Sequence, residues 1–251
     1  MKPWPYPRWI AHRGAGLLAP ENTLAAFQQG ARHAYRMFEC DVKLSADGVP
    51  FLLHDATLDR TTNAHGLAGE WRWAQLSELD AGSWHSPAFA GEPLCTLQTL
   101  GRWLQGRGLL LNLEIKPTPG TEAQTGERVA RAAAELWADA KVWPLLTSFQ
   151  PACLQAAARV APHLPRGLLI HEWPDDVLAH LAEHRHSALI AEHSLWTPER
   201  LNQVRAAGFW RLSYTVNDPE IAQRLWHWGH EAIITDRIDL FHPERHPGGS
   251  S

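Results

Sequence analysis

Short apolar runs alternate with amphipathic stretches along most of the chain. The first run, Arg8–His12, is followed by Asn22–Ala34, in which Leu24, Phe27 and Ala31 recur at helical spacing. A short apolar run is typical of a buried strand, and apolar residues three and four positions apart are typical of a helix with one buried face. The pattern therefore predicts a strand and then a helix at the start of the chain.

The same alternation continues towards the C-terminus. Together with the first run it predicts eight strands, which begin at Arg8, Met37, Leu109, Leu145, Arg166, Ala188, Arg211 and Ala232. Further helices are predicted at Leu97–Gln105, Glu122–Asp139, Ala152–Val160, Asp175–Glu183, Pro198–Ala207 and Pro219–Trp228. Val49–Leu53, which follows a turn at Ala46-Asp47-Gly48, is a strand-like run outside this series.

Strands that alternate with helices form a parallel sheet, because each helix carries the chain back to the start of the next strand. Eight strand–helix units in 251 residues match the size of a TIM (β/α)8 barrel. A doubly wound open sheet is the alternative, but the Gly-x-Gly-x-x-Gly pattern that usually follows its first strand is missing. We therefore predict an α/β fold, with residues 1–251 as a single TIM-barrel domain interrupted after the second strand by a polar, weakly periodic segment.

The composition narrows the class of protein without identifying it. The 23 Lys and Arg against 27 Asp and Glu give a net charge of −4, whereas nucleic-acid-binding proteins usually carry a basic excess. No apolar run approaches the about 20 residues that span a bilayer, and Met1–Pro7 lacks the apolar core of a signal peptide. We expect a cytoplasmic protein with no nucleic-acid partner and no stable membrane insertion.

The cysteines and histidines add little chemistry of their own. Cys40, Cys95 and Cys153 are far apart and form no Cys-x-x-Cys, which indicates neither a disulfide framework nor a zinc knuckle. Buried, unreactive thiols are expected instead. Most of the 15 histidines are expected on the surface or as satisfied polar groups.

In a TIM barrel the active site lies at the carboxyl ends of the strands, and acidic residues gather there in this chain. Glu39 and Asp41 are two positions apart on one strand, so their side chains share a face, as do those of Glu114 and Lys116. Three neighbouring carboxylates repel one another unless a cation lies between them. Because oxygen ligands suit Mg²⁺ or Ca²⁺, we favour a metal site over the alternative of rim charges paired with Arg or Lys.

Other strand ends add groups that suit a phosphate ester. Arg13 offers a planar fork and Lys116 a point charge for phosphate oxygens. His12 and His54 offer two groups able to give and take protons, as histidine does in general acid–base catalysis. Gly14 permits a sharp turn or a close backbone approach. Together these groups meet the needs of a phosphodiester hydrolase, although a lone His-Arg-Gly is also compatible with a surface ion pair and a satisfied loop carbonyl.

The order of these motifs resembles the signature of the glycerophosphodiester phosphodiesterase family, over about residues 8 to 240. The likeness is carried by His12-Arg13-Gly14, Pro20-Glu21-Asn22-Thr23, Glu39-x-Asp41, Asp47-Gly48, His54-Asp55, Glu114-Ile115-Lys116, Ser148-Phe149, Tyr214-Thr215-Val216-Asn217 and Thr235-Asp236. The segments Trp4-Pro5-Tyr6-Pro7, Ala81-Gly82-Ser83-Trp84 and Pro165-Arg166-Gly167-Leu168 resemble the cytoplasmic bacterial type associated with glycerol-3-phosphate uptake. The chain departs from the pattern at Gly229-His230-Glu231-Ala232, where Gly-x-Asp-Gly is usual, and at Tyr214, where many relatives have Trp.

The resemblance implies a TIM barrel with a small insertion at about residues 56–93. It implies metal-dependent hydrolysis of glycerophosphodiesters, such as glycerophosphocholine and glycerophosphoethanolamine, to sn-glycerol 3-phosphate and an alcohol. By position, the resemblance assigns His12 and His54 as the acid–base pair, Arg13 and Lys116 to the substrate phosphate, and Glu39, Asp41 and Glu114 to Mg²⁺ or Ca²⁺.

Two other functions are kept as alternatives. A metal-dependent sugar-phosphate aldolase or isomerase also uses carboxylates, a lysine and a metal, but the two histidines beside Arg13 fit diester cleavage better. A non-catalytic barrel that binds phosphate esters is the other. The head-group preference, the native metal, the acid and base roles of the two histidines, and direct water attack against a cyclic phosphate stay open. So does the choice between a monomer and a homodimer.

Several neighbouring residues carry two interpretations each. Asn22 or Thr23 is expected to cap a helix. Glu21 is expected either to belong to the same helix start or to brace the side chain of Arg13 or His12.

The same holds near the other strand ends. Asp55 either orients His54 or closes a turn, and Asn217 either contacts the substrate glycerol or caps the helix at Asp218. Asp236 is expected only to finish the barrel. Aromatic residues with two possible roles, in the pocket wall or in the core, are Phe149, Trp173, Trp196 and Tyr214.

Overall fold

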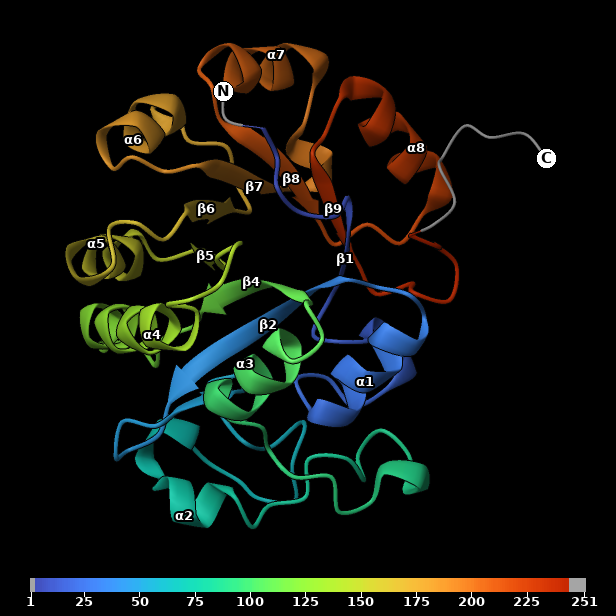
Figure 1. Cartoon of the computed structure of the whole chain (residues 1–251), viewed down its shortest axis with the longest axis vertical. Helices are drawn as coiled ribbons and strands as arrows, with labels where there is room; N and C mark the ends of the chain where they lie inside the picture. The colour runs from blue at the N-terminus through green and yellow to red at the C-terminus, as the bar shows by residue number, and fades with distance from the viewer. Residues whose placement is uncertain (1–2, 244–251) are drawn as a thin grey trace.

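The computed structural model describes residues 3–243, so both ends of the predicted 1–251 domain lie outside the described range. Within it, eight parallel strands form a closed barrel (Figure 1), because β1 pairs with both β9 and β2. The strands are β1 (Trp9–Ala11), β2 (Met37–Leu44), β4 (Leu110–Ile115), β5 (Leu145–Ser148), β6 (Arg166–Ile170), β7 (Ala188–Glu192), β8 (Trp210–Tyr214) and β9 (Ala232–Thr235). The predicted TIM barrel is confirmed, and the open-sheet alternative is wrong.

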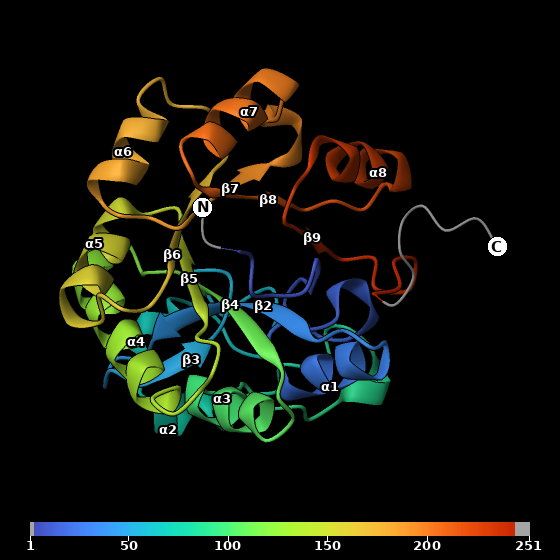
Figure 2. The ribbon, with the colours of Figure 1, turned by 45° about the horizontal axis from the view of Figure 1, so that its top comes forward.

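In the described residues, seven helices each lie in the chain between two successive barrel strands. Figure 2 shows helices outside the ring of strands. They are α1 (Leu24–Arg32), α3 (Leu97–Gln105), α4 (Glu122–Leu136), α5 (Pro151–Val160), α6 (Val177–Glu183), α7 (Pro198–Ala206) and α8 (Pro219–Trp228). Helices α3 and α8 have the predicted bounds. Local signals fix the ends of α8, since the Asp218 side chain accepts from the backbone at its start and Gly229, at φ 93°, ends it.

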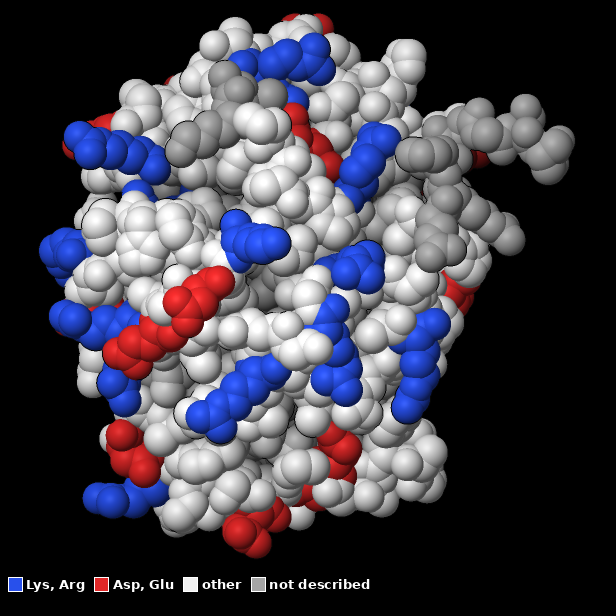
Figure 3. Space-filling view, in the orientation of Figure 1, with Lys and Arg blue, Asp and Glu red and all other residues white. Residues whose placement is uncertain are grey.

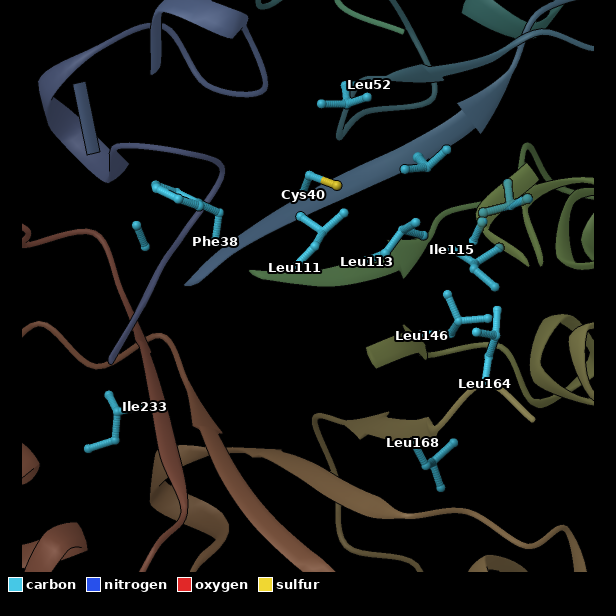
Figure 4. Close-up of a cluster of buried hydrophobic side chains, with 14 of the residues drawn as sticks. Phe38, Cys40, Leu52, Leu111, Leu113, Ile115, Leu146, Leu164, Leu168 and Ile233 are labelled. Carbon is cyan, nitrogen blue, oxygen red and sulfur yellow. The ribbon is translucent and has the colours of Figure 1, made fainter. Parts of the chain in front are cut away.

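The strands separate two apolar regions, because successive side chains point to opposite sides of a sheet. Outward-facing residues pack under the helices, as Figure 4 shows for Phe38 and Cys40 of β2 and for Leu111 and Leu113 of β4. A second cluster, which includes Met37, fills the inside of the barrel. The described cysteines are free and buried, as expected.

A segment between β2 and α3 adds a small lobe at one side of the barrel. Strand β3 (Pro50–Leu52) pairs antiparallel with β2, and the chain then runs through the short helix α2 (Trp73–Leu76) before α3. Figure 1 shows this part below α1 and α3. Its own apolar cluster includes Phe51, Leu58 and Leu76. The predicted insertion at 56–93 falls within this lobe.

The surface gives two further observations. No helix in residues 3–243 is long and apolar enough to cross a membrane. On the face seen in Figure 3, Lys and Arg side chains are spread out, with Asp and Glu side chains between them at the left and lower parts. This face carries no single continuous basic patch of the kind that nucleic-acid-binding proteins use.

Candidate active site

Three carboxylates meet inside the carboxyl end of the barrel. Asp41 of β2 lies directly across from Glu114 of β4, and Glu39 is one inward-facing position earlier on β2. Each offers an oxygen within 4.8 Å of the other two, and all three residues are buried. The spacing in the sequence therefore placed the predicted cluster correctly.

Burial and the neighbouring charges set the pKa of each of these carboxylates. Burial raises the pKa of Glu114 to about 7, with help from the charge of Asp41. Burial and the charges of Asp41 and Glu114 likewise raise the pKa of Glu39 well above its usual range. Burial acts on Asp41 in the same direction, but Arg13, Lys116 and His54 outweigh it and lower the Asp41 pKa. Asp41 is therefore the anionic centre of the group.

The cluster fits a hard divalent cation better than it fits ion pairing alone. Lys116 lies 3.2 Å from a Glu114 oxygen and 3.6 Å from an Asp41 oxygen, and Arg13 Nε lies 3.4 Å from Asp41, so part of the ion-pair alternative is correct. Glu39, however, has no Lys or Arg side-chain partner among residues 3–243, and its buried Oε1 has no hydrogen bond there. A buried carboxylate oxygen with no partner is rare, and three acidic oxygen donors match the ligand preference of Mg²⁺ or Ca²⁺.

His12 follows β1 and is paired with the residue after β9. Its Nδ1 lies 2.6 Å from Asp236 Oδ1, and its Nε2 lies 3.8 Å from Glu39 Oε2. Asn217 donates to Asp236 Oδ2 at 2.9 Å and accepts from the Asp236 backbone at 2.9 Å. Asp236 thus orients His12 in addition to ending the barrel. Asn217 clamps Asp236, and the helix cap is Asp218.

His54 is held from both sides, which fixes where its proton lies. Its Nδ1 lies 2.7 Å from Asp55 Oδ1, and Lys116 Nζ lies 2.7 Å from its Nε2. Because a lysine ammonium only donates, Nε2 must accept, and the ring proton belongs on Nδ1, where it is donated to Asp55. Burial lowers the His54 pKa, so the neutral ring is favoured. Of the two interpretations of Asp55, the one that orients His54 is confirmed.

The loop after β1 presents Arg13 to the same centre. Arg13 adopts φ 50°, its backbone N–H donates to Glu39 at 2.9 Å, and its Nη1 donates to Glu21 at 2.9 Å. Thr23 is the cap of α1, accepting from the Ala26 backbone. The two interpretations of this region thus belong to different residues, with Thr23 as the cap and Glu21 as the brace of Arg13.

Asn22 has a role that the sequence did not reveal. At φ 60° it donates from Nδ2 to Asp41 at 2.9 Å and accepts from the Asp41 backbone at 3.1 Å. Asn22 therefore orients the central carboxylate and does not cap the helix.

Two glycines let this loop approach its neighbours. Gly14 has φ 99°, and a Cβ there would lie 2.9 Å from the Cβ of Ala26. Gly16 has φ 55°, and a Cβ there would lie 2.0 Å from the Asp236 backbone oxygen. Side chains at either position would displace the loop from α1 or from the partner of His12.

Two cations near the site were not predicted. Lys43, two positions after Asp41 on β2, is fully buried and donates to the Lys116 backbone oxygen at 3.2 Å. Burial lowers its pKa to about 8. The alternation that placed Glu39 and Asp41 on one face also places Lys43 there, so a signal existed. Arg60 comes from the weakly periodic segment, which carried no such signal.

The predicted aromatic residues divide between the two expected roles. Phe149 and Tyr214 lie beside the site, with ring centroids 5.7 Å apart and Lys116 Nζ 5.8 Å from the Phe149 ring. The ring centroids of Trp173 and Trp196 are 5.5 Å apart, and both side chains belong to the apolar region between the strands and the helices. Of these four aromatic residues, Phe149 and Tyr214 are therefore the two that lie beside the candidate site.

Comparison with protein families gives a match over most of the chain. Residues 12–240 match the model of the glycerophosphoryl diester phosphodiesterase family. A glycerophosphodiester phosphodiesterase of Caldanaerobacter subterraneus subsp. tengcongensis is 33% identical over 238 residues, which cover 90% of this chain and 93% of that protein. The matched region contains every residue of the candidate site named above.

Solved structures resemble the whole barrel. The structure of a phosphodiesterase from Oleispira antarctica in complex with its product sn-glycerol-3-phosphate is 32% identical, with a TM-score of 0.86. The match covers 92% of this chain and 93% of that one. A glycerophosphodiester phosphodiesterase from Agrobacterium tumefaciens is 28% identical, with a TM-score of 0.77 over 94% of this chain and 99% of that chain.

Proposed function

The chain belongs to the glycerophosphoryl diester phosphodiesterase family, and from that premise we propose how its site performs the reaction. The enzyme hydrolyses glycerophosphodiesters to sn-glycerol 3-phosphate and an alcohol. It follows that neither the aldolase or isomerase nor the non-catalytic barrel is retained as an alternative. The proposal assigns roles to His12, His54, Arg13 and Lys116.

One observation supports the proposal above the others. His12 and His54 each engage a carboxylate through Nδ1, at 2.6 Å and 2.7 Å, so that Nε2 of each ring faces the carboxylate cluster. The His12 Nε2 lies 3.8 Å from Glu39, and the His54 Nε2 is joined to the carboxylate cluster through Lys116. Two oriented imidazoles beside one acidic centre suit a reaction that moves one proton on and one proton off.

The proposed mechanism uses two cationic side chains, two histidines and the two aspartates that orient the histidines. Arg13 and Lys116 bind the phosphate oxygens, and binding draws the Lys116 ammonium away from His54 Nε2. One histidine, in its neutral form, takes the proton of the attacking hydroxyl at Nε2, and the other, in its doubly protonated form, gives its Nε2 proton to the departing alcohol oxygen. Asp55 and Asp236 stabilise whichever ring becomes positively charged.

We propose that Glu39, Asp41 and Glu114 hold the divalent cation, Mg²⁺ or Ca²⁺. When bound, such a cation neutralises and polarises the phosphoryl oxygens as a Lewis acid. Burial and the neighbouring carboxylate charges raise the pKa of Glu39 and of Glu114, and a cation held by these residues would favour their ionised forms.

The attacking group is tested by isotope and product analysis. Water is one nucleophile, and the 2-hydroxyl of the substrate glycerol, which gives a cyclic phosphate, is the other. Hydrolysis in ¹⁸O-labelled water puts one labelled oxygen in the phosphate by either route, but only the first route does so without an unlabelled cyclic phosphate on the way. A transient cyclic glycerophosphate supports the second.

The proposed substrates are glycerophosphocholine and glycerophosphoethanolamine. The Oleispira antarctica relative holds sn-glycerol-3-phosphate as its product, which supports a site built around that half of the diester. A cytoplasmic location and a monomer or homodimer stay predictions from the sequence.

The roles of the two histidines are tested by His12→Gln and His54→Gln, with His65→Gln as the matched control. His65 also pairs with an aspartate, Asp59, at 3.0 Å, but it is largely exposed. We expect each site variant to lose on the order of 10²–10⁴-fold in kcat while the control keeps wild-type activity. If both site variants turned over at the wild-type rate, the assigned roles would be wrong.

A further inference from the structure

We propose that Arg60 is a positioning residue that fixes the orientation of His54 and Arg13 relative to each other. It does so by bridging the carboxylate that orients His54 and the carboxylate that braces Arg13. The inference rests on the proposed roles of His54 and Arg13. Arg60 touches neither side chain directly, so it acts through Asp55 and Glu21 and is not itself a catalytic residue.

On one side Arg60 fixes the partner of His54. Its Nε donates to Asp55 Oδ2 at 2.7 Å and its Nη2 donates to Asp55 Oδ1 at 3.1 Å. The same Oδ1 accepts from His54 Nδ1 at 2.7 Å. Asp55 is adjacent to His54 in the chain and its side chain is 29% exposed, so Arg60 supplies the constraint that keeps its carboxylate facing the ring.

On the other side Arg60 fixes the brace of Arg13. Its Nη1 donates to Glu21 Oε2 at 2.8 Å and its Nη2 donates to Glu21 Oε1 at 2.7 Å. Glu21 Oε1 also accepts from Arg13 Nη1 at 2.9 Å. One guanidinium therefore makes four hydrogen bonds to two carboxylates, each of which contacts a proposed site residue.

The chemistry requires arginine at this position. Its planar guanidinium presents fixed donors along two edges, which suits two bidentate carboxylates at once. A lysine ammonium is a single point with no such fork. Exposed single ion pairs contribute little, but a doubly bidentate arrangement restrains both carboxylates in orientation as well as in charge.

The lobe that follows β3 sets the position of Arg60. Leu58, two residues earlier, is fully buried in the apolar cluster of that lobe, and Thr61, the next residue, is buried as well. The Arg60 guanidinium lies 6.0 Å from the ring of Trp84, which belongs to the same lobe. Through Arg60 this segment therefore supports the geometry of a site built on the barrel.

The test compares Arg60→Gln and Arg60→Lys with Arg131→Gln. Arg131 makes an exposed ion pair with Glu127 on α4, at 2.8 Å, so its variant controls for the loss of a surface arginine. We expect Arg60→Gln to lower kcat/KM on glycerophosphocholine by about 10–100-fold, the usual effect of removing a group that orients a site residue. Both kcat, through His54, and KM, through Arg13, should change, and the melting temperature should stay close to that of Arg131→Gln.

The lysine variant separates positioning from charge. Arg60→Lys keeps the charge but is able to hold only one carboxylate well, so it should recover only part of the lost kcat/KM. Full recovery by lysine would overturn the bridging role. Wild-type values of kcat and KM in Arg60→Gln, in an assay where His54→Gln is inactive, would overturn the inference and leave the proposed function standing.

A spectroscopic measurement tests the inference independently of turnover. In ¹⁵N-labelled protein, the His54 Nδ1–H donated to Asp55 should give a sharp ring signal, which Arg60→Gln should broaden or shift and Arg131→Gln should not. An unchanged signal would overturn the inference. If the wild type failed to hydrolyse any glycerophosphodiester, the proposed function would fail, and this spectrum alone would decide whether Arg60 orients His54.

Discussion

The two ends of the barrel interior are lined by the same strands and yet have opposite chemistry. Along β2 the inward-facing residues run from Met37 at the amino end to Glu39, Asp41 and Lys43 at the carboxyl end. At the amino end the rings of Trp4, Tyr6 and Trp210 pack together, with Trp4 5.2 Å from Trp210. One end is therefore apolar and aromatic, and the other holds buried charges.

The difference shows how this barrel separates stability from reaction chemistry. At the amino end, burial of large rings stabilises the fold, and the Tyr6 hydroxyl finds a partner in the Trp143 backbone oxygen at 2.8 Å. At the carboxyl end, acidic side chains are buried close together, which opposes folding and forms the cluster that we propose binds a cation. Substitutions at the two ends should therefore affect different measurements.

Glu39→Gln should have the largest effect on activity. The substitution removes the acidic oxygen that has no protein partner, so we expect divalent cation binding to weaken and kcat/KM to fall on the order of 10³-fold. Calorimetric titration with Mg²⁺ and Ca²⁺, together with the activity assay, measures both. Wild-type cation affinity in this variant would contradict the metal assignment. The metal-free protein should lose no stability, because a buried carboxyl under repulsion is removed.

Trp210→Ala should produce the reverse pattern. The Trp210 side chain is buried against Trp4 and Tyr6, so truncation should lower the free energy of unfolding by about 3–5 kcal/mol. At 25 °C, where the variant remains folded, kcat should stay within about twofold of wild type. Urea denaturation and steady-state kinetics test this separation, and a loss of kcat without loss of stability would break it.

Glu114→Gln should change how stability depends on pH. The Glu114 pKa is raised to about 7 in the fold from 4.5. As pH rises, the unfolded chain therefore loses this proton before the folded protein does. The contribution of Glu114 to the stability of the metal-free protein falls between about pH 4.5 and pH 7. Relative to wild type, metal-free Glu114→Gln should gain about 1–3 kcal/mol between pH 5 and pH 8. A constant difference across that range would contradict the raised pKa.

Tyr214→Phe should have the smallest effect. Its hydroxyl donates to the Ile170 backbone oxygen at 2.8 Å, and its ring lies against that of Phe149. Loss of one partly buried hydrogen bond should cost about 1 kcal/mol of stability, with KM changed less than about threefold. Thermal unfolding and KM for glycerophosphocholine check this, and a large loss of kcat would place Tyr214 in the reaction itself.

The sequence predicted the barrel and the charged cluster because both depend on local periodicity. Alternation along β2 and β4 is enough to bring Glu39, Asp41 and Glu114 to one face. The pairing of His12 with Asp236 depends on contact between residues 224 positions apart, and barrel closure brings β1 beside β9 without specifying which side chains meet. Arg60 was missed because the lobe that carries it follows no period of helix or strand.

The central claim is that the charged end of the barrel is a metal-dependent diesterase site. The most direct measurement is release of sn-glycerol 3-phosphate from glycerophosphocholine, before and after EDTA treatment, and again with Mg²⁺ or Ca²⁺ restored. The account predicts release that EDTA stops and that either or both cations restore. Continued release by protein shown to be free of metal would contradict the assignment of Glu39, Asp41 and Glu114 to a cation.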